Sequence, residues 1–150
     1  MNRAWKPNVT VAALIERKGR FLLVEEETED GLRFDQPAGH LDAGESLVAA
    51  CAREALEETA YAFTPTELVG IYQWPRPQGD ITYLRFAFAG KVGACDTARR
   101  LDAGILRAVW MTPDEIRSCA DRHRSPLVAQ CVSDYLAGRR YPLELLRHYD

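Results

Sequence analysis

The sequence predicts one compact domain of the mixed α/β class, in which helices cover both sides of a mixed β-sheet. Segments typical of strands and helices follow one another in the order strands, helix, strands, helices. The chain has 150 residues, about the size of one domain, and 47% hydrophobic residues are enough to fill one core. Because no repeat or linker divides the sequence, we expect residues 1–150 to form a single domain.

The first third of the chain predicts sheet followed by a long helix. Residues 9–15 and 20–25 are β-rich and flank a short connection, which is typical of a hairpin. The polar residues 26–31 predict a turn, and a proline and a glycine exclude regular helix from residues 34–39. Residues 46–59 are rich in Ala, Leu, Glu and Arg and contain no Gly or Pro, so we expect a helix there.

The rest of the chain predicts further strands and then two helices. Residues 68–74 and 81–89 are β-like and are joined by turn residues, and residues 105–111 predict another strand. Residues 112–115 (Thr-Pro-Asp-Glu) combine an N-cap, a proline at the first helical position and a capping-box glutamate, so a short helix should follow. Ser-Pro at 125–126 indicates the start of a helix that ends near Gly138.

The composition excludes several classes of function. Nineteen basic against twenty-two acidic residues give a net charge of −3, so the chain has no cationic field to hold polymeric DNA or RNA. The apolar segments are too short to span a membrane, and the N-terminus lacks an apolar signal sequence. The four cysteines form no C-x-x-C pair, which suits a reducing compartment. We therefore expect a soluble, cytoplasmic protein, with a monomer as the default.

Three glutamates on the predicted helix are the strongest functional signal. Glu54, Glu57 and Glu58 are spaced i, i+3 and i+4, so they share an arc of about 100° on one helix face. We expect the apolar residues to pack on the opposite side and the acids to point away from the core. Arg53 can pair with Glu57 but cannot neutralise three carboxylates. A divalent cation can, and oxygen ligands favour Mg²⁺ or Mn²⁺ over Zn²⁺.

An ordinary solvated helix face is the alternative interpretation of these acids, because charged helix faces are common. The loop before the helix argues against it. A glycine-containing turn can direct backbone carbonyls at a metal and amides at an anion, so the Gly39 loop and the acids together could hold a metal-pyrophosphate.

These residues also match a known sequence signature. The signature of the Nudix hydrolases is G-x5-E-x7-R-E-U-x-E-E-x-G-U, in which U is a bulky aliphatic residue. This chain matches it at Gly39, Glu45, Arg53, Glu54, Glu57 and Glu58. The chain therefore resembles the Nudix hydrolases. Ala55, Ala60 and Tyr61 depart from the pattern at positions that pack or end the helix. Ala60 replaces the final glycine and would be strained if that residue adopted a positive φ.

The resemblance extends over nearly the whole chain. Segments that begin at Lys6, Gln36, Arg124 and Arg140 resemble the NudJ-type phosphatases, a bacterial subgroup of that family. The resemblance implies a Nudix-type α/β/α sandwich and a Mg²⁺-dependent enzyme that cleaves P–O–P bonds. It further implies small-molecule substrates, namely nucleoside tri- and diphosphates and the pyrophosphates of thiamine and hydroxymethylpyrimidine.

The resemblance also implies roles for individual residues. Glu54, Glu57 and Glu58 would bind metal, together with the carbonyl of Gly39. Arg53 would orient Glu57, and Glu45 would support the corner between loop and helix. The general base remains open: Glu58 or Glu57 is our hypothesis, and Asp102, ahead of Asp96, is the first candidate outside the helix.

Substrate recognition is expected on the two strands that follow the helix. Planar rings stack on a base or a pyrimidine, and of Tyr72, Trp74, Tyr83 and Phe86 we select Trp74. Arg85, in an otherwise apolar strand, is the first candidate for a phosphate contact, and Arg20 is the second. The role of His40 stays open. A Nudix-fold module that binds a phosphorylated ligand without cleaving it is the alternative function, and an isomerase on the same fold ranks last.

Overall fold

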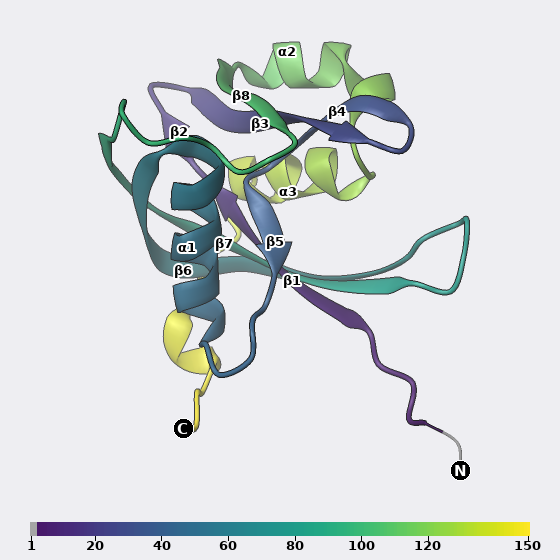
Figure 1. Cartoon of the computed structure of the whole chain (residues 1–150). Helices are drawn as coiled ribbons and strands as arrows, with labels where there is room; N and C mark the ends of the chain where they lie inside the picture. Colours follow the sequence, from purple (N-terminus) through teal and green to yellow (C-terminus); the bar gives the residue numbers. More distant parts are fainter. Residues whose placement is uncertain (1–2) are drawn as a thin grey trace.

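The computed structural model describes residues 3–150 (Figure 1). Its elements occur in the following order: β1 (Asn8–Leu14), β2 (Glu16–Arg17), β3 (Arg20–Thr28), β4 (Gly31–Asp35), β5 (Ala38–His40), α1 (Leu47–Thr59), β6 (Tyr61–Pro75), β7 (Thr82–Cys95), β8 (Ile105–Met111), α2 (Pro113–Ser118), the 3-10 turn η1 (Ala120–Arg122), α3 (Leu127–Leu136), β9 (Tyr141–Pro142) and η2 (Leu143–Leu145). The predicted helices and the later strands are confirmed. β6 and β7 extend well beyond the segments predicted for them.

The strands form two sheets. The larger sheet has the order β5-β1-β7-β6-β9, and it is mixed because β1 and β7 run parallel while the other neighbours are antiparallel. In the smaller sheet β3 pairs with β2 or β4 on one side and with β8 on the other, all antiparallel. The predicted mixed sheet is therefore present, and a second sheet accompanies it.

The predicted hairpin between residues 9–15 and 20–25 is confirmed only next to its turn. β1 pairs with β5 and β7 in the larger sheet, and only the two residues of β2 turn back on β3. Both edges of β1 are occupied by these strands, so β3 has no free edge of β1 to pair with. The turn predicted for residues 26–31 is shorter than expected, because β3 continues to Thr28 and β4 begins at Gly31.

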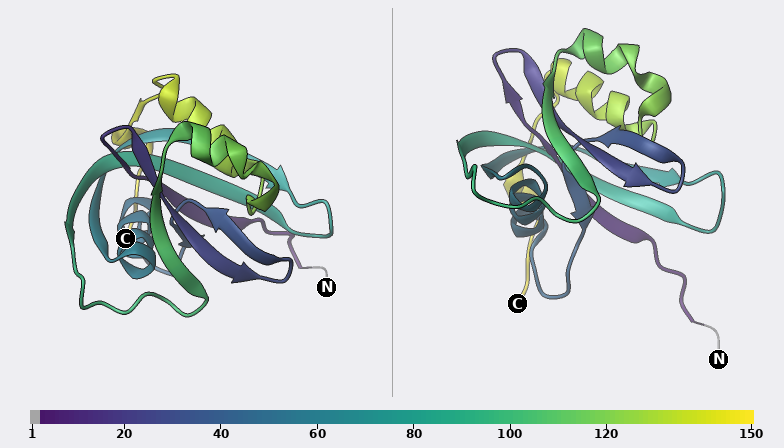
Figure 2. Two further views of the ribbon diagram at one scale, coloured as in Figure 1. Left: turned by 90° about the horizontal axis from the view of Figure 1, so that it is seen from above. Right: turned by 45° about the horizontal axis from the view of Figure 1, so that its top comes forward.

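Helices cover both faces of this framework (Figure 2). Val11 and Ala13 of β1 pack in the cluster that contains Ala50, Cys51 and Ala55 of α1. The alternate residues of β1, Ala12 and Leu14, pack with Cys131 of α3. A third cluster joins the smaller sheet to α2 and α3. These contacts confirm the predicted fold class with helices on both sides. Within residues 3–150, every helix is too short or too polar to cross a membrane.

Ala60 ends α1 in a conformation with positive φ, the case for which the sequence predicted strain. Its φ is 65°, in the left-handed region, and its N–H donates to the carbonyl of Leu56 at 2.9 Å. Ala60→Gly should therefore raise the free energy of unfolding by about 0.5–1 kcal/mol, measured by urea denaturation. Ala49→Gly, at an exposed helical position of α1, is the matched control and should lower it by a similar amount. Destabilisation by Ala60→Gly would contradict this account.

Candidate active site

Helix α1 buries two of the three acidic residues in its signature segment, Glu54 and Glu58. Ser46 caps the helix by accepting from the N–H of Ala49 at 3.0 Å. The buried stripe of the helix then includes Glu54 and Glu58, each only 8% exposed, beside Ala55. The prediction that all three acids point away from the core is therefore wrong. β5 and the sheets that pack on α1 determine which side of the helix is buried. Of the three glutamates, only Glu57 stays partly exposed.

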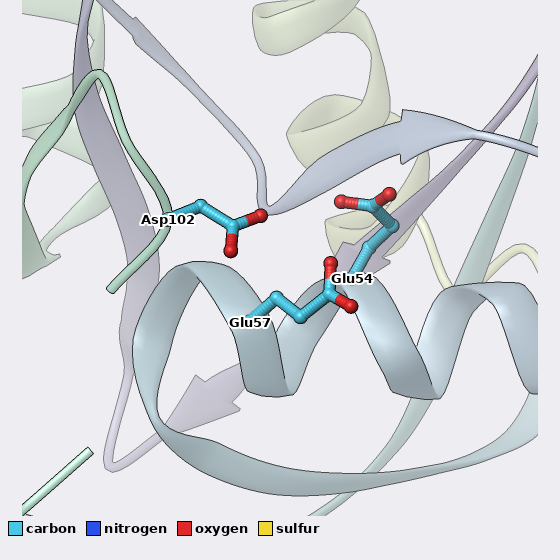
Figure 3. Close-up of side chains that lie close together, drawn as sticks. All are labelled: Glu54, Glu57 and Asp102. Atoms are coloured by element: carbon cyan, nitrogen blue, oxygen red, sulfur yellow. The ribbon is translucent and has the colours of Figure 1, made fainter. Parts of the chain in front are cut away.

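Glu54 and Glu57 form a carboxylate cluster with Asp102. One oxygen of each side chain lies within 4.8 Å of the others, and Figure 3 shows Asp102 reaching toward the helix from the loop before β8. The N–H of Asp102 donates to the carbonyl of Glu57 at 3.1 Å, and the N–H of Asp96 donates to the carbonyl of Ala60 at 2.8 Å. Backbone carbonyls at the end of α1 that have no partner within the helix thus accept hydrogen bonds from the loop that carries Asp102, and these bonds hold the loop in place.

Asp102, the first candidate for the general base outside the helix, is therefore part of the cluster. The side chain of Asp96 instead accepts from the N–H of Ala98 within its own loop, at 3.1 Å. Glu58 lies outside the cluster, and its Oε1 accepts from the N–H of Ala38 at 3.0 Å, which ties α1 to β5.

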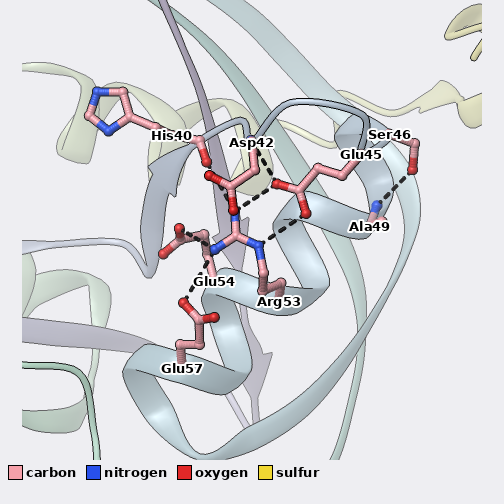
Figure 4. A network of polar contacts seen from close by, with 8 residues as sticks. All are labelled: His40, Asp42, Glu45, Ser46, Ala49, Arg53, Glu54 and Glu57. Carbon is pink, nitrogen blue, oxygen red and sulfur yellow. Dashed lines mark hydrogen bonds and ion pairs between the residues drawn. The ribbon is translucent and has the colours of Figure 1, made fainter.

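Arg53 joins the glutamates of the helix to the preceding loop (Figure 4). Its Nη1 donates to Glu54 at 2.8 Å and to Glu57 at 3.2 Å. The rest of the guanidinium donates to both carboxylate oxygens of Glu45, at 3.0 and 2.7 Å, and to the carbonyl of His40 at 3.0 Å. Hydrogen bonds from Arg53 lower the pKa of Glu45. This geometry agrees with the orienting role predicted for Arg53 and the supporting role predicted for Glu45.

Gly39 lies directly against the carboxylate of Glu54. A Cβ added to Gly39 would come within 2.2 Å of Cδ and within 2.3 and 2.4 Å of the two carboxylate oxygens of Glu54. A side chain at position 39 therefore cannot coexist with the present position of Glu54. This close approach is a physical reason for glycine at the first position of the signature.

Burial makes ionisation of the glutamates on the inner face costly. Burial raises the pKa of Glu58 to about 9, against the hydrogen bond from Ala38, and the charges of Glu26 and Glu54 raise it further. Burial also raises the pKa of Glu54, although hydrogen bonds from Arg53 oppose the shift. Because the ionised form of these carboxylates is costly here, a cation that offsets their negative charge would bind favourably at the site. Glu26 was not predicted from the sequence, because no local spacing links it to α1.

Glu58 should make the metal-free protein less stable as the pH rises. The folded state keeps its proton up to about pH 9, whereas the unfolded state loses it near the ordinary value of 4.5. The unfolded state therefore binds fewer protons in this interval, and stability falls between these pH values. Glu58→Gln, which keeps an oxygen for Ala38, should raise the free energy of unfolding at pH 8 by on the order of 2 kcal/mol but change it little at pH 5.

Urea denaturation in the presence of a chelator measures this difference. Glu144→Gln, at an exposed position of η2, is the control and should show no such dependence on pH. An equal effect of Glu58→Gln at pH 5 and pH 8 would contradict the assignment.

The structure separates the two predicted phosphate-binding arginines from the acids. Arg85 is 6% exposed, and its guanidinium donates to both carboxylate oxygens of Asp35 at 3.1 Å and to Gln36 at 3.0 Å. It is therefore a buried ion pair, and the phosphate contact predicted for it has no support. Arg20 begins β3, at the end remote from Glu26, so its predicted phosphate contact is equally unsupported.

Trp74 is the predicted substrate residue whose surroundings fit a ligand. Its ring stacks with Tyr83 of β7, with centroids 6.0 Å apart and an interplanar angle of 16°, and both side chains are partly exposed. Phe86 instead packs against the core, and the hydroxyl of Tyr72 donates to Asp134 at 2.7 Å. The ring of His40 lies apart from Arg53 in Figure 4, and its carbonyl is the group that Arg53 binds.

The fold and the carboxylate cluster define a protein of mixed α/β class whose acidic site can hold a divalent cation. The family model of the NUDIX domain matches residues 5–131. The chain therefore belongs to the Nudix hydrolase family. It is 39% identical to the phosphatase NudJ of Escherichia coli K12 over 146 residues, which cover 97% of this chain and 94% of that protein.

Solved structures agree with this assignment. A NUDIX hydrolase from Nitrosomonas europaea has a TM-score of 0.93 and 53% sequence identity, with 96% of this chain and 98% of that chain covered. A MutT NUDIX hydrolase from Burkholderia pseudomallei has a TM-score of 0.74 at 17% identity, with 87% and 98% covered, which shows likeness of fold alone.

Proposed function

We propose that this Nudix hydrolase is a Mg²⁺-dependent pyrophosphohydrolase of nucleoside tri- and diphosphates or of thiamine-type pyrophosphates, with Mn²⁺ as a possible substitute. The observation that carries the proposal is the cluster of Glu54, Glu57 and Asp102, whose carboxylate oxygens lie within 4.8 Å of one another. The similarity to the phosphatase NudJ supports the substrate class. We further propose that residues 1–150 act as one domain, monomeric and cytoplasmic, on small molecules rather than on polymeric nucleic acid.

The residues present fit a hard divalent cation. They offer carboxylate oxygens without His or Cys, which is the ligand set of Mg²⁺ or Mn²⁺. Glu54, Glu57 and Asp102 would hold it, with the carbonyl of Gly39 and the carboxylate of Glu58 as the further ligands that the signature implies. A bound cation of this kind neutralises phosphate oxygens and makes a bound water more acidic.

Side chains of this protein would position the carboxylates of the site and accept a proton from the attacking water. Arg53 fixes Glu54 and Glu57 through their hydrogen bonds, so both carboxylates are oriented before a substrate arrives. Glu57 and Asp102 are more exposed than Glu58, and a water molecule reaches them more easily. We therefore propose Glu57 or Asp102 as the acceptor of the water proton. Glu58 remains a candidate from the sequence, although its hydrogen bond to Ala38 suits a positioning role.

Phosphate release from a panel of compounds tests the proposal. The panel contains nucleoside di- and triphosphates, thiamine pyrophosphate, hydroxymethylpyrimidine pyrophosphate, ADP-ribose and dinucleoside polyphosphates, each assayed with Mg²⁺, with Mn²⁺ and with a chelator. We expect release from one of the first three groups, and at least a 100-fold loss of rate in the chelator, on the order of what a catalytic metal contributes. Cleavage of ADP-ribose alone would overturn the substrate class. Binding without any cleavage would favour the alternative, a ligand-binding module.

A further inference from the structure

Arg124 is an accessible cation that the fold holds firmly in place. Its backbone N–H donates to the carbonyl of Phe34 at 2.9 Å, which anchors the residue beside β4. Its guanidinium donates to Glu26 at 2.5 Å, and 47% of its side chain remains exposed. In contrast to the buried Arg85, Arg124 can therefore meet a ligand without leaving its position.

Glu26 connects Arg124 to the acidic side of α1. The side chain of Glu26 is 14% exposed. Across the smaller sheet Glu26 pairs with Ile105 of β8, whose N–H donates to the carbonyl of Asp102 at 3.1 Å. Arg124 is thus connected to the carboxylate cluster through Glu26 and the loop that carries Asp102.

The aromatic pair Trp74–Tyr83 is connected to Arg124 through β4. Asp35 follows Phe34, whose carbonyl accepts from Arg124. The carboxylate of Asp35 accepts from Arg85 of β7 at 3.1 Å. Tyr83 lies two residues before Arg85, on the same face of β7. Tyr83 stacks on Trp74, its register partner across β6 and β7. The β3–β4 and β6–β7 hairpins project from the same side of the molecule in Figures 1 and 2.

We propose that Arg124 binds a phosphate of the substrate, between the carboxylate cluster and a planar ring that stacks on Trp74–Tyr83. The inference rests on the proposed function and names the residues that would hold the phosphate and the planar ring of its substrates. A phosphate offers the guanidinium two oxygens, whereas the carboxylate of Glu26 accepts through one, so the substrate would replace Glu26 as its partner.

The test is Arg124→Gln, assayed on the ring-bearing pyrophosphate of the panel that is cleaved fastest. We expect KM to rise about tenfold while kcat stays within about twofold, because a charge-assisted hydrogen bond to bound substrate is lost. Arg124→Lys, which keeps the charge, should fall in between. Arg107→Gln is the matched control: it also removes an arginine paired with a glutamate of β3, Glu25 at 2.8 Å, and it should leave KM unchanged.

Calorimetry separates the failure of this inference from that of the proposed function. The same compound, with Mg²⁺, is titrated into Glu57→Gln protein with and without Arg124→Gln, and Kd should rise about tenfold with the second change. Unchanged KM and Kd in an enzyme that cleaves the compound would overturn the role of Arg124 alone. A protein that binds but never cleaves would overturn the proposed function, and the Kd ratio would still decide on Arg124. Absence of both binding and cleavage would overturn both.

Discussion

Glu57→Gln should lower kcat for phosphoanhydride hydrolysis by about 100-fold or more at saturating Mg²⁺. The carboxylate of Glu57 belongs to the cluster with Glu54 and Asp102, and an amide there has no charge and one oxygen fewer. The side chain of Glu57 is 28% exposed, so the change should leave the melting temperature nearly unaltered. Steady-state kinetics and thermal melting measure the two effects separately.

A second measurement ties this loss to the metal. Mn²⁺ binding, followed by electron paramagnetic resonance, should weaken in Glu57→Gln protein, whereas Glu144→Gln, at an exposed position outside the site, should bind like the wild type. A turnover within a fewfold of wild type at saturating Mg²⁺ would show that the site lies elsewhere.

Gly39→Ala should lower kcat by about 10- to 100-fold in a protein that still folds. The added methyl group would lie 2.2 Å from Cδ of Glu54, so that carboxylate must leave its place in the cluster and beside Arg53. The atoms that must move belong to the end of a flexible side chain, which is why stability should change little. Kinetics and the Mn²⁺ titration give the effect on the site, and thermal melting gives the effect on the fold.

Two further variants decide whether Gly39→Ala acts through Glu54. Gly93→Ala, on β7, places a methyl group 3.4 Å from the Cβ of Ala62 and should leave kcat unchanged. Adding Glu54→Asp to Gly39→Ala shortens the obstructed side chain, so the double variant should be no less active than Gly39→Ala. Full activity of Gly39→Ala would contradict a site built on this close approach.

Local signals predicted the elements that carry the site. Helix α1 follows from a run of helix-forming residues without glycine or proline, a signal that acts within a few positions of the chain. The same holds for α2, where Thr112 and Glu115 form the predicted capping box. The signature correctly located the side chains that Arg53 holds together, and Asp102 was the leading candidate from outside the helix.

Interactions between distant segments account for what the sequence did not predict. The partner of β1 in the larger sheet is β7, and nothing near residues 9–15 announces it. The burial of Glu54 and Glu58 depends on the strands that cover α1, so helical periodicity alone assigned them to the wrong side. Arg85 resembled an open phosphate ligand because Asp35, which neutralises it, lies 50 residues away in the sequence.

The parallel pairing of β1 with β7 has a consequence for how the chain is made. Residues 8–14 align with residues 83–89, so the centre of the larger sheet joins segments about half the chain apart. During synthesis the N-terminal strand and helix α1 leave the ribosome long before this partner exists. The sheet can close only after translation has passed β7, and such non-local closure is slow compared with the folding of helical domains of equal size.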